Sequence, residues 1–158
     1  MMDKLQQRPD INILEFKRRC LRYGRLQETA FADLNLTADT INYSFPEENG
    51  RTLLGIATIQ GDVGAVTKLL SIEGVNPNIA DNQGRTPLIA AARLNYLVVE
   101  ALLRHVNIDP LLQDNAGLTA HAQAQQANLL PIVELLAPFT ADANAGNPNN
   151  DRMRMGRL

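Results

Sequence analysis

Apolar side chains recur along the middle of this chain at steps of three and four residues, in pairs of short segments separated by polar turns. Such a spacing places the apolar residues on one face of a helix, so each pair of segments predicts two helices that pack together. The expected core residues are Leu54, Ala57, Leu88, Ala91 and Ala124 from the first helices, and Val63, Val66, Leu69, Leu70, Leu97, Val99, Leu102, Leu103, Ile132, Val133, Leu135 and Leu136 from the second helices.

Each first helix follows a turn that contains glycine and then threonine. Glycine adopts backbone angles that are costly for other residues, and the threonine hydroxyl can cap the first turn of a helix. We therefore expect helices to begin near Thr52, Thr86 and Thr119. Between the two helices of each pair we expect a tight turn with left-handed backbone angles, which glycine and asparagine tolerate. The residues at that position are Gly61, Asn95 and Asn128.

These signals return at a fixed step. The turns Asn49-Gly50-Arg51-Thr52, Gln83-Gly84-Arg85-Thr86 and Ala116-Gly117-Leu118-Thr119 place their glycines 34 and 33 residues apart. The segments Ile41-Asn42-Tyr43, Val75-Asn76-Pro77 and Ile108-Asp109-Pro110 keep the same step. A period of 33 with a Gly-x-Thr-x-Leu opening resembles the ankyrin repeat, a finger-like turn followed by two antiparallel helices. The resemblance covers roughly residues 11–139 and implies an all-α solenoid of stacked helix-turn-helix units.

The expected organisation is a flexible N-terminus (1–10), one ankyrin-repeat domain (11–139) and a disordered tail (140–158), where apolar periodicity disappears. The domain would contain an N-terminal cap unit (11–40) and repeats at 41–74, 75–107 and 108–139, the last being the C-terminal cap.

Within the cap unit, Asp10 can begin a helix over about 11–23, Gly24 can end it, and a partner helix can run from 26 to 34. At the other end, Gln125 stands where a neighbouring repeat has Ala92, so no further finger-bearing unit is expected.

Composition and charge narrow the class of protein. The chain has 158 residues, 45% apolar and 4% aromatic, which suits one domain of thin helices. Its single cysteine, Cys20, allows no disulfide within the chain and favours a reducing compartment. The start is too polar for a signal peptide and no apolar run approaches the ~18 residues that span a bilayer, so we expect a cytoplasmic protein that does not insert into membranes. The net charge of −2 makes nucleic acid an unexpected partner.

No catalytic, cofactor-binding or metal site is expected. His105 and His121 have no cysteine or carboxylate at zinc-site spacing, and no phosphate loop or nucleophile elbow occurs. The acidic residues Asp62, Asp81, Asp109 and Asp114 recur at turn positions, where such side chains bond nearby backbone.

One column departs from the family. Many ankyrin repeats carry Thr-Pro-Leu-His, whose histidine bridges to neighbouring backbone, but that column here holds Gly55, Ile89 and Ala122. We therefore expect a stack held mainly by apolar packing, with a stability that depends little on pH near 6.

The resemblance also implies a binding surface, the concave face formed by fingertips and exposed sides of first helices. The residues that the resemblance implies would contact a partner are Phe45, Pro46, Glu48, Asn49, Ile59 and Gln60 in the first repeat, Ile79, Ala80, Asn82, Gln83, Arg93 and Leu94 in the second, and Leu112, Gln113, Asn115, Ala116, Gln126 and Ala127 in the third. Several are apolar, and five of these are large hydrophobic residues that are expected to be exposed: Phe45, Ile59, Ile79, Leu94 and Leu112. Ile79 and Leu112 could instead tuck under adjacent fingers. Arg93 is either a polar anchor or a solvated side chain.

The features favour a non-enzymatic interaction module, an adaptor or inhibitor that binds one main protein partner and is itself a monomer. One alternative is an ankyrin-repeat effector secreted by an intracellular bacterium and acting on a host protein, with a translocation signal in residues 140–158. A small-molecule binder or enzyme would need a deep cavity near Arg93, Asn95 or His121. Self-assembly through a repeat face is a further alternative.

Overall fold

The computed structural model describes residues 12, 14, 16 and 36–140. Leu14 and Phe16 are helical, and the Phe16 side chain is buried. The other expectations for the N-terminal cap unit, with Asp10, Gly24 and the helix over 26–34, lie outside the described residues. So does the tail from residue 141 onward.

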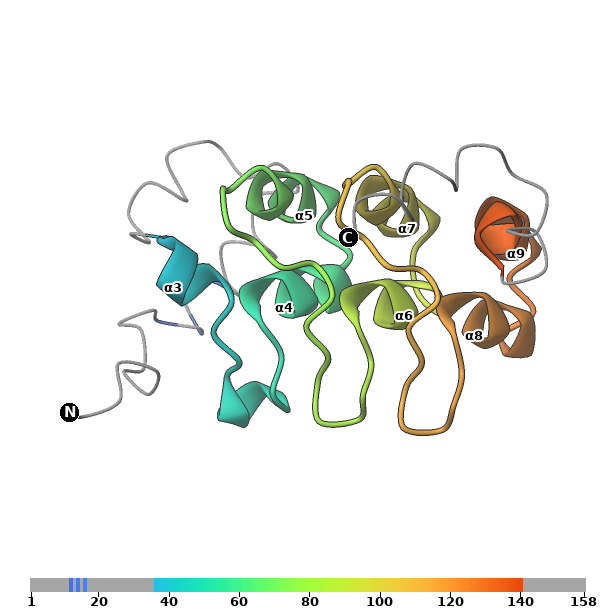
Figure 1. The fold of residues 1–158 in the computed structure, drawn as a ribbon, viewed down its shortest axis with the longest axis horizontal. Coiled ribbons are helices and arrows are strands. Elements are labelled where there is room, and N and C mark those ends of the chain that lie inside the picture. The colour runs from blue at the N-terminus through green and yellow to red at the C-terminus, as the bar shows by residue number, and fades with distance from the viewer. Residues whose placement is uncertain (1–11, 13, 15, 17–35, 141–158) are drawn as a thin grey trace, which may run out of the picture.

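The described part of the chain forms two layers of helices that stand side by side (Figure 1). The first helices are α4 (Leu53–Gln60), α6 (Pro87–Ala91) and α8 (Ala120–Gln126), and the second helices are α5 (Val63–Leu70), α7 (Tyr96–Leu103) and α9 (Leu130–Leu136). A short helix, α3 (Ala38–Ile41), precedes them, and the 3-10 helices are η1 (Pro46–Glu48) and η2 (Ala137–Phe139). Loops between the repeats extend as fingers beyond the first-helix layer. Within these residues the only strand-like pairing is an isolated bridge between Phe45 and Arg51.

The threonine caps are confirmed. The hydroxyls of Thr52, Thr86 and Thr119 each accept a hydrogen bond of 3.3 Å from the backbone N–H three residues later, which satisfies one of the unpaired donors at the helix start. In α6, Pro87 follows its cap at the first helical position, where the missing N–H is not needed.

The turn between paired helices matches the prediction at two of three positions. Gly61 and Asn128 have positive φ angles of 70° and 55°. The prediction is wrong for Asn95, whose φ is −153°. Its side-chain oxygen accepts hydrogen bonds from the N–H groups of Leu97 and Val98, so Asn95 is the N-cap of α7 and takes the extended backbone that a cap requires.

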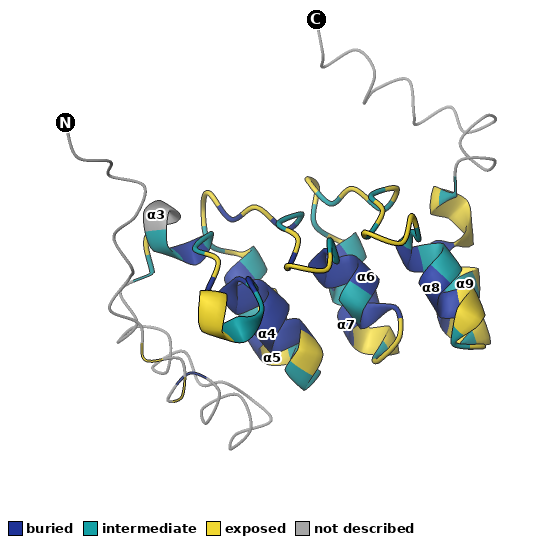
Figure 2. Cartoon of the chain, turned by 90° about the horizontal axis from the view of Figure 1, so that it is seen from below, coloured by how far each residue is buried: buried dark blue, intermediate teal, exposed yellow. Residues whose placement is uncertain are grey.

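The core is built from residues of both helix layers, and Figure 2 shows buried stretches along α4, α6 and α8. All five residues expected from the first helices are buried. The prediction that Leu97 belongs to the core is wrong, because its side chain is 56% exposed. The buried face of α7 carries Val98, Val99 and Leu102. Leu97 lies outside this face and is therefore exposed to solvent. The rest of the expected second-helix set is buried or partly buried against the core.

Polar contacts also join successive repeats, so the expectation of a stack held mainly by apolar packing is incomplete. The Asn42 amide donates to Gly74 O and accepts from Asn76 N–H, at 2.8 and 2.7 Å. The Asn78 amide bonds Asn107 O and Asp109 N–H in the same way, at 2.7 and 2.9 Å. An asparagine amide offers both a donor and an acceptor, so it can bond the backbone of a neighbouring segment at two points.

Candidate functional site

The predicted binding residues divide by exposure. Those at the ends of the first helices reach solvent, with Ile59 38% and Leu94 56% exposed, together with Arg93 and Gln126. The fingertip residues Asn82, Gln83 and Asn115 are exposed as well. Residues that are only partly exposed are Glu48, Asn49, Gln60, Ile79 and Leu112. In Figure 2 exposed segments lie on the fingers and at the turns that join paired helices.

Phe45 is a correction to the predicted surface, because its side chain is fully buried. Its ring packs edge-on against Tyr43, with ring centroids 4.8 Å apart. Its backbone N–H donates to Arg51 O, and its own carbonyl accepts from Gly50 N–H. The first finger thus closes on itself around η1, which turns Phe45 into the core rather than toward a partner.

The exposed apolar surface is therefore smaller than the sequence predicts. Ile79 and Leu112 are only partly exposed. Ile59 and Leu94 remain as the exposed apolar members, Ile59 near the C-terminal end of α4 and Leu94 just after α6.

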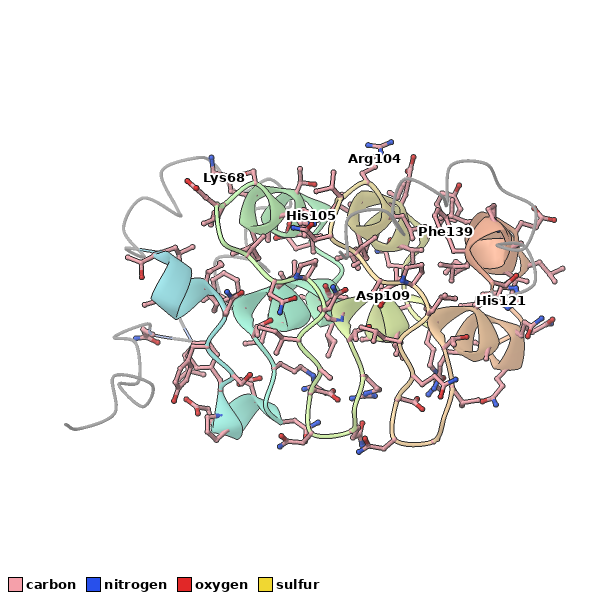
Figure 3. All side chains as sticks on the ribbon, in the orientation of Figure 1. Lys68, Arg104, His105, Asp109, His121 and Phe139 are labelled. Carbon is pink, nitrogen blue, oxygen red and sulfur yellow. The ribbon has the colours of Figure 1, made fainter. Side chains whose placement is uncertain are left out.

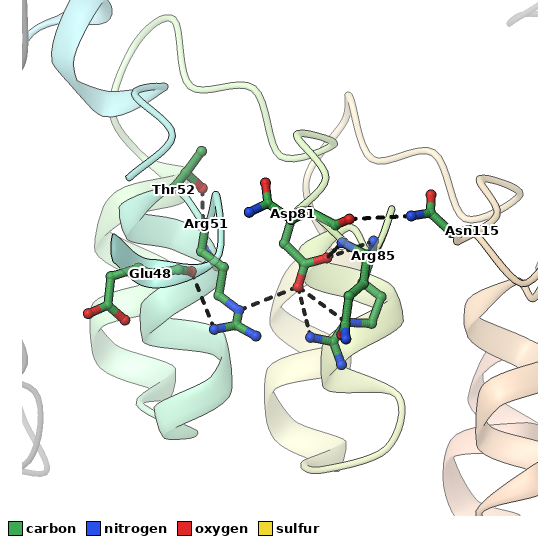
Figure 4. Close-up of polar contacts among 9 residues, drawn as sticks. Glu48, Arg51, Thr52, Asp81, Arg85 and Asn115 are labelled. Atoms are coloured by element: carbon green, nitrogen blue, oxygen red, sulfur yellow. Dashed lines mark hydrogen bonds and ion pairs between the residues drawn. The ribbon is translucent and has the colours of Figure 1, made fainter. Parts of the chain in front are cut away.

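The fingertips are tied to one another through backbone. Asn82 N–H donates to Asn49 O at 2.9 Å, and Asn115 N–H donates to Gln83 O at 3.0 Å. The Asn115 amide also donates to Asn82 O at 3.3 Å, as Figure 4 shows. These bonds hold each finger against its neighbour. The predicted binding residues of the fingers therefore form a row in which their relative positions are nearly fixed.

A charged cluster beside this row was missing from the predicted site. The Asp81 carboxylate lies 2.8 Å from Arg85 Nη2 in its own repeat and 3.5 Å from Arg51 Nε in the preceding repeat (Figure 4). One signal in the sequence could have found it, because an acidic residue stands four residues before an arginine in both Glu47-Glu48-Asn49-Gly50-Arg51 and Asp81-Asn82-Gln83-Gly84-Arg85.

The four turn aspartates bond backbone as predicted. Asp62 accepts from Ala65 N–H, Asp81 from Gln83 and Arg85, Asp109 from Leu111, and Asp114 from Ala116 and Leu118. These bonds belong to turns and a helix cap, and together they account for a structural role of all four carboxylates.

Two of these carboxyls have a perturbed pKa. Burial raises the pKa of Asp81, but hydrogen bonds from the Arg85 side chain and from the Arg85 and Gln83 N–H groups outweigh it, so the pKa lies below its ordinary value. The pKa of Asp114 is also lowered. Burial again acts upward, and the Leu118 N–H, the Gln123 amide and the Ala116 N–H outweigh it. Both side chains therefore stay charged at neutral pH.

The arginine and aspartate side chains lie in a shallow depression between the first and second repeats. Its charged residues are Arg51, Asp81 and Arg85, and Ile59, Ile79 and Pro87 are among its apolar ones. It encloses about 10 Å³, enough for one water-sized group. A free small molecule would gain little burial there, whereas one side chain of a larger partner could contact it.

A second hollow of about 250 Å³ lies at the C-terminal end of the stack, beside His121 and Phe139 (Figure 3). It is the feature that a small-molecule site near His121 would require. Pockets for drug-sized ligands are typically about 300–1,000 Å³ and enclose most of the ligand. This hollow is smaller and partly open, and Thr119, one of its four polar residues, already caps α8.

Among the residues that the structure describes, no three histidine, cysteine, aspartate or glutamate side chains gather as metal ligands would. No helix in that part of the chain has the length and apolar character needed to cross a membrane.

Comparison with known families agrees with this architecture. A model of ankyrin repeats, with three copies, matches residues 26–114 and 54–147. Ankyrin repeats generally serve as protein–protein interaction modules and are typically not enzymes. The match and the stack of helix pairs with linked fingers together show that the chain belongs to the ankyrin-repeat family.

Proposed function

We propose that this protein is an adaptor or inhibitor that binds one main protein partner through its fingers and the exposed ends of its first helices. The observation that carries the proposal is the exposure of Ile59 and Leu94 on α4 and just after α6, beside exposed Arg93. Folding of a monomer does not require apolar side chains at such positions, and exposed apolar groups beside an arginine are common in protein interfaces.

The finger row supports the same surface. Its backbone bonds hold neighbouring fingers together before any partner arrives, so less conformational entropy is lost on binding. We further propose that the protein acts as a monomer, and light scattering over a range of concentrations would test this. No observation on the described residues favours the effector, small-molecule or self-assembly alternatives.

The proposal can be tested by capturing partners from lysate with three forms of the protein. These are the parent chain, the double variant Ile59→Ser with Leu94→Ser, and the control Val106→Ser. Val106 is 83% exposed and follows α7, away from the first-helix ends. The two changed surfaces thus lose apolar area of the same kind at different places.

We expect a protein retained by the parent and by Val106→Ser to be lost from the double variant, and mass spectrometry would identify it. Circular dichroism must first show that all three forms have the same helix content. Equal retention by the three forms would contradict the proposed surface.

A further inference from the structure

We propose that the depression between the first and second repeats receives the carboxylate of an aspartate or glutamate on the partner protein, next to an apolar partner residue that rests on Ile59. This inference rests on the proposed function and adds the chemistry of the partner segment. It is carried by the geometry of the cluster formed by Arg51, Asp81 and Arg85 (Figure 4).

Within the depression two guanidinium groups share the single carboxylate of Asp81, and Arg85 also acts electrostatically on Asp114 in the third repeat. The Asp81 side chain is nearly buried, whereas those of Arg51 and Arg85 are 22% and 24% exposed. Solvent and any partner therefore meet the arginines rather than the acid. Positive potential at a partly desolvated surface favours a negatively charged group on the partner.

The guanidinium groups still have donors to offer. Arg51 donates from Nη1 to Glu48 O at 3.4 Å, and its Nε lies 3.5 Å from the Asp81 carboxylate without making a hydrogen bond. Arg85 donates from Nε and Nη2 to Asp81. Arg51 Nη2 and Arg85 Nη1 make no hydrogen bond within the described residues. The carboxylate of Glu48 points away from Arg51 in Figure 4, so it does not fill this place.

Charge and size favour a carboxylate over a phosphate group. A carboxylate carries one negative charge, and its two oxygens match the planar donors of a guanidinium. A phosphate group carries about −1.5 to −2 at pH 7, so Asp81 would repel it more strongly than it would repel a carboxylate. The water-sized space suits the end of a side chain that is anchored elsewhere on a partner.

The apolar residues that line the depression indicate what kind of partner residue should lie next to that acid. Ile59 lines the depression and is 38% exposed, and Ile79 and Pro87 continue the wall on the second repeat. A partner segment that places its carboxylate over the two arginines would bring an adjacent side chain onto this wall. An aliphatic or aromatic residue there would remove apolar surface from water on both sides.

The test uses peptides, so that the partner need not be known. A phage-displayed library of random peptides is selected on the immobilised full chain, and bound peptides are sequenced and measured by fluorescence polarisation. We expect enriched peptides to share an aspartate or glutamate next to an apolar residue. Replacing that acid by its amide should weaken binding about tenfold, as expected for loss of a charge-assisted hydrogen bond.

A double-mutant cycle assigns the effect to the cluster. Arg51→Gln should weaken the acidic peptide about tenfold and its amide analogue less than twofold. Arg104→Gln is the matched control, because Arg104 pairs with Glu100 on the second-helix layer, away from the fingers (Figure 3). Arg85→Lys keeps the charge beside Asp81 and loses the planar donor pair, so it should fold and still bind more weakly.

The outcomes separate this inference from the proposed function. Enriched peptides without an acid, an Arg51→Gln effect equal for both peptides, or a library that yields no binders would overturn the inference. If the peptides then lose affinity for the Ile59→Ser, Leu94→Ser double variant, the proposed surface stands without the acid site. Peptides that ignore all of these substitutions would contradict both.

Discussion

The Asp81 carboxylate contacts side chains of two repeats, so its protonation should lower the stability of the fold. Its folded pKa is lowered, so its carboxylate adds stability that is complete above the ordinary aspartate pKa of about 3.9 and is lost as pH falls through the folded pKa. At pH 7 we expect Asp81→Asn to lower the free energy of unfolding by about 1.5–3 kcal/mol, the range for hydrogen bonds to charged groups.

The pH dependence checks this assignment. Melting temperatures by circular dichroism should differ between parent and Asp81→Asn at pH 7. The difference should shrink as pH falls below about 4, because the unfolded-state carboxylate gains its proton there and the folded one only at lower pH. Near pH 6 both proteins should show a flat profile, because the column of Gly55, Ile89 and Ala122 carries no bridging histidine. A difference that does not change with pH would show that the Asp81 charge is not what stabilises the fold.

Two glycines provide a matched pair for the contact between fingers. Gly84 and Gly117 have nearly equal φ angles of 75° and 77°, in the left-handed region. A Cβ on Gly84 would lie 2.7 Å from Asn115 N and collide with the Asn115 side-chain oxygen, whereas one on Gly117 would meet nothing within 4 Å.

Both alanine variants should therefore lose about 1–2 kcal/mol from left-handed strain, and Gly84→Ala should lose more because the next finger must shift. Urea unfolding followed by circular dichroism measures the difference. Equal losses would mean that the third finger moves aside without resistance.

The helices illustrate how much local sequence can predict. A threonine hydroxyl capping its own helix depends on residues three apart, so Thr52, Thr86 and Thr119 could be assigned without knowing any neighbouring element. The role of Asn95 could not be assigned from local sequence, because asparagine suits both a left-handed turn and a helix cap. The structure uses it as the cap of α7.

The links between repeats depend on side chains that the period alone does not reveal. Asn78 bonds the backbone of residues 107 and 109 through both ends of its amide. Asn78→Ala should lower the free energy of unfolding by about 1–2 kcal/mol, since two hydrogen bonds of modest net value are lost.

Asn107→Ala is the control, because Asn107 takes part in this link only through its backbone carbonyl, which the substitution keeps. Its stability should stay close to that of the parent. If the two variants are equally stable, the Asn78 bridge contributes nothing measurable in solution.

For the molecule as a whole, stacking predicts uneven stability along the chain. Helices α6 and α7 contact neighbours on both sides, whereas α9 has none beyond it among the described residues except η2. In a repeat array each unit is stabilised mainly by its neighbours, so the units at an end open more often. Amide hydrogen exchange should therefore be slower in α7 than in α9, and equal protection would indicate that the described repeats unfold only together.

The repeat period, the three helix pairs and most of the core follow from the order of residues, because helix faces and caps depend on side chains that lie within four positions of each other. The candidate surface could be predicted from the sequence only in part. Ile59 and Leu94 are exposed as expected, but Phe45, expected at the surface, is buried, and Leu97, expected in the core, is exposed. The bonds from Asp81 to Arg51 and from Asn78 to residues 107 and 109 join units about one repeat apart. Which groups meet across that distance depends on how the repeats stack, so these contacts required the folded arrangement.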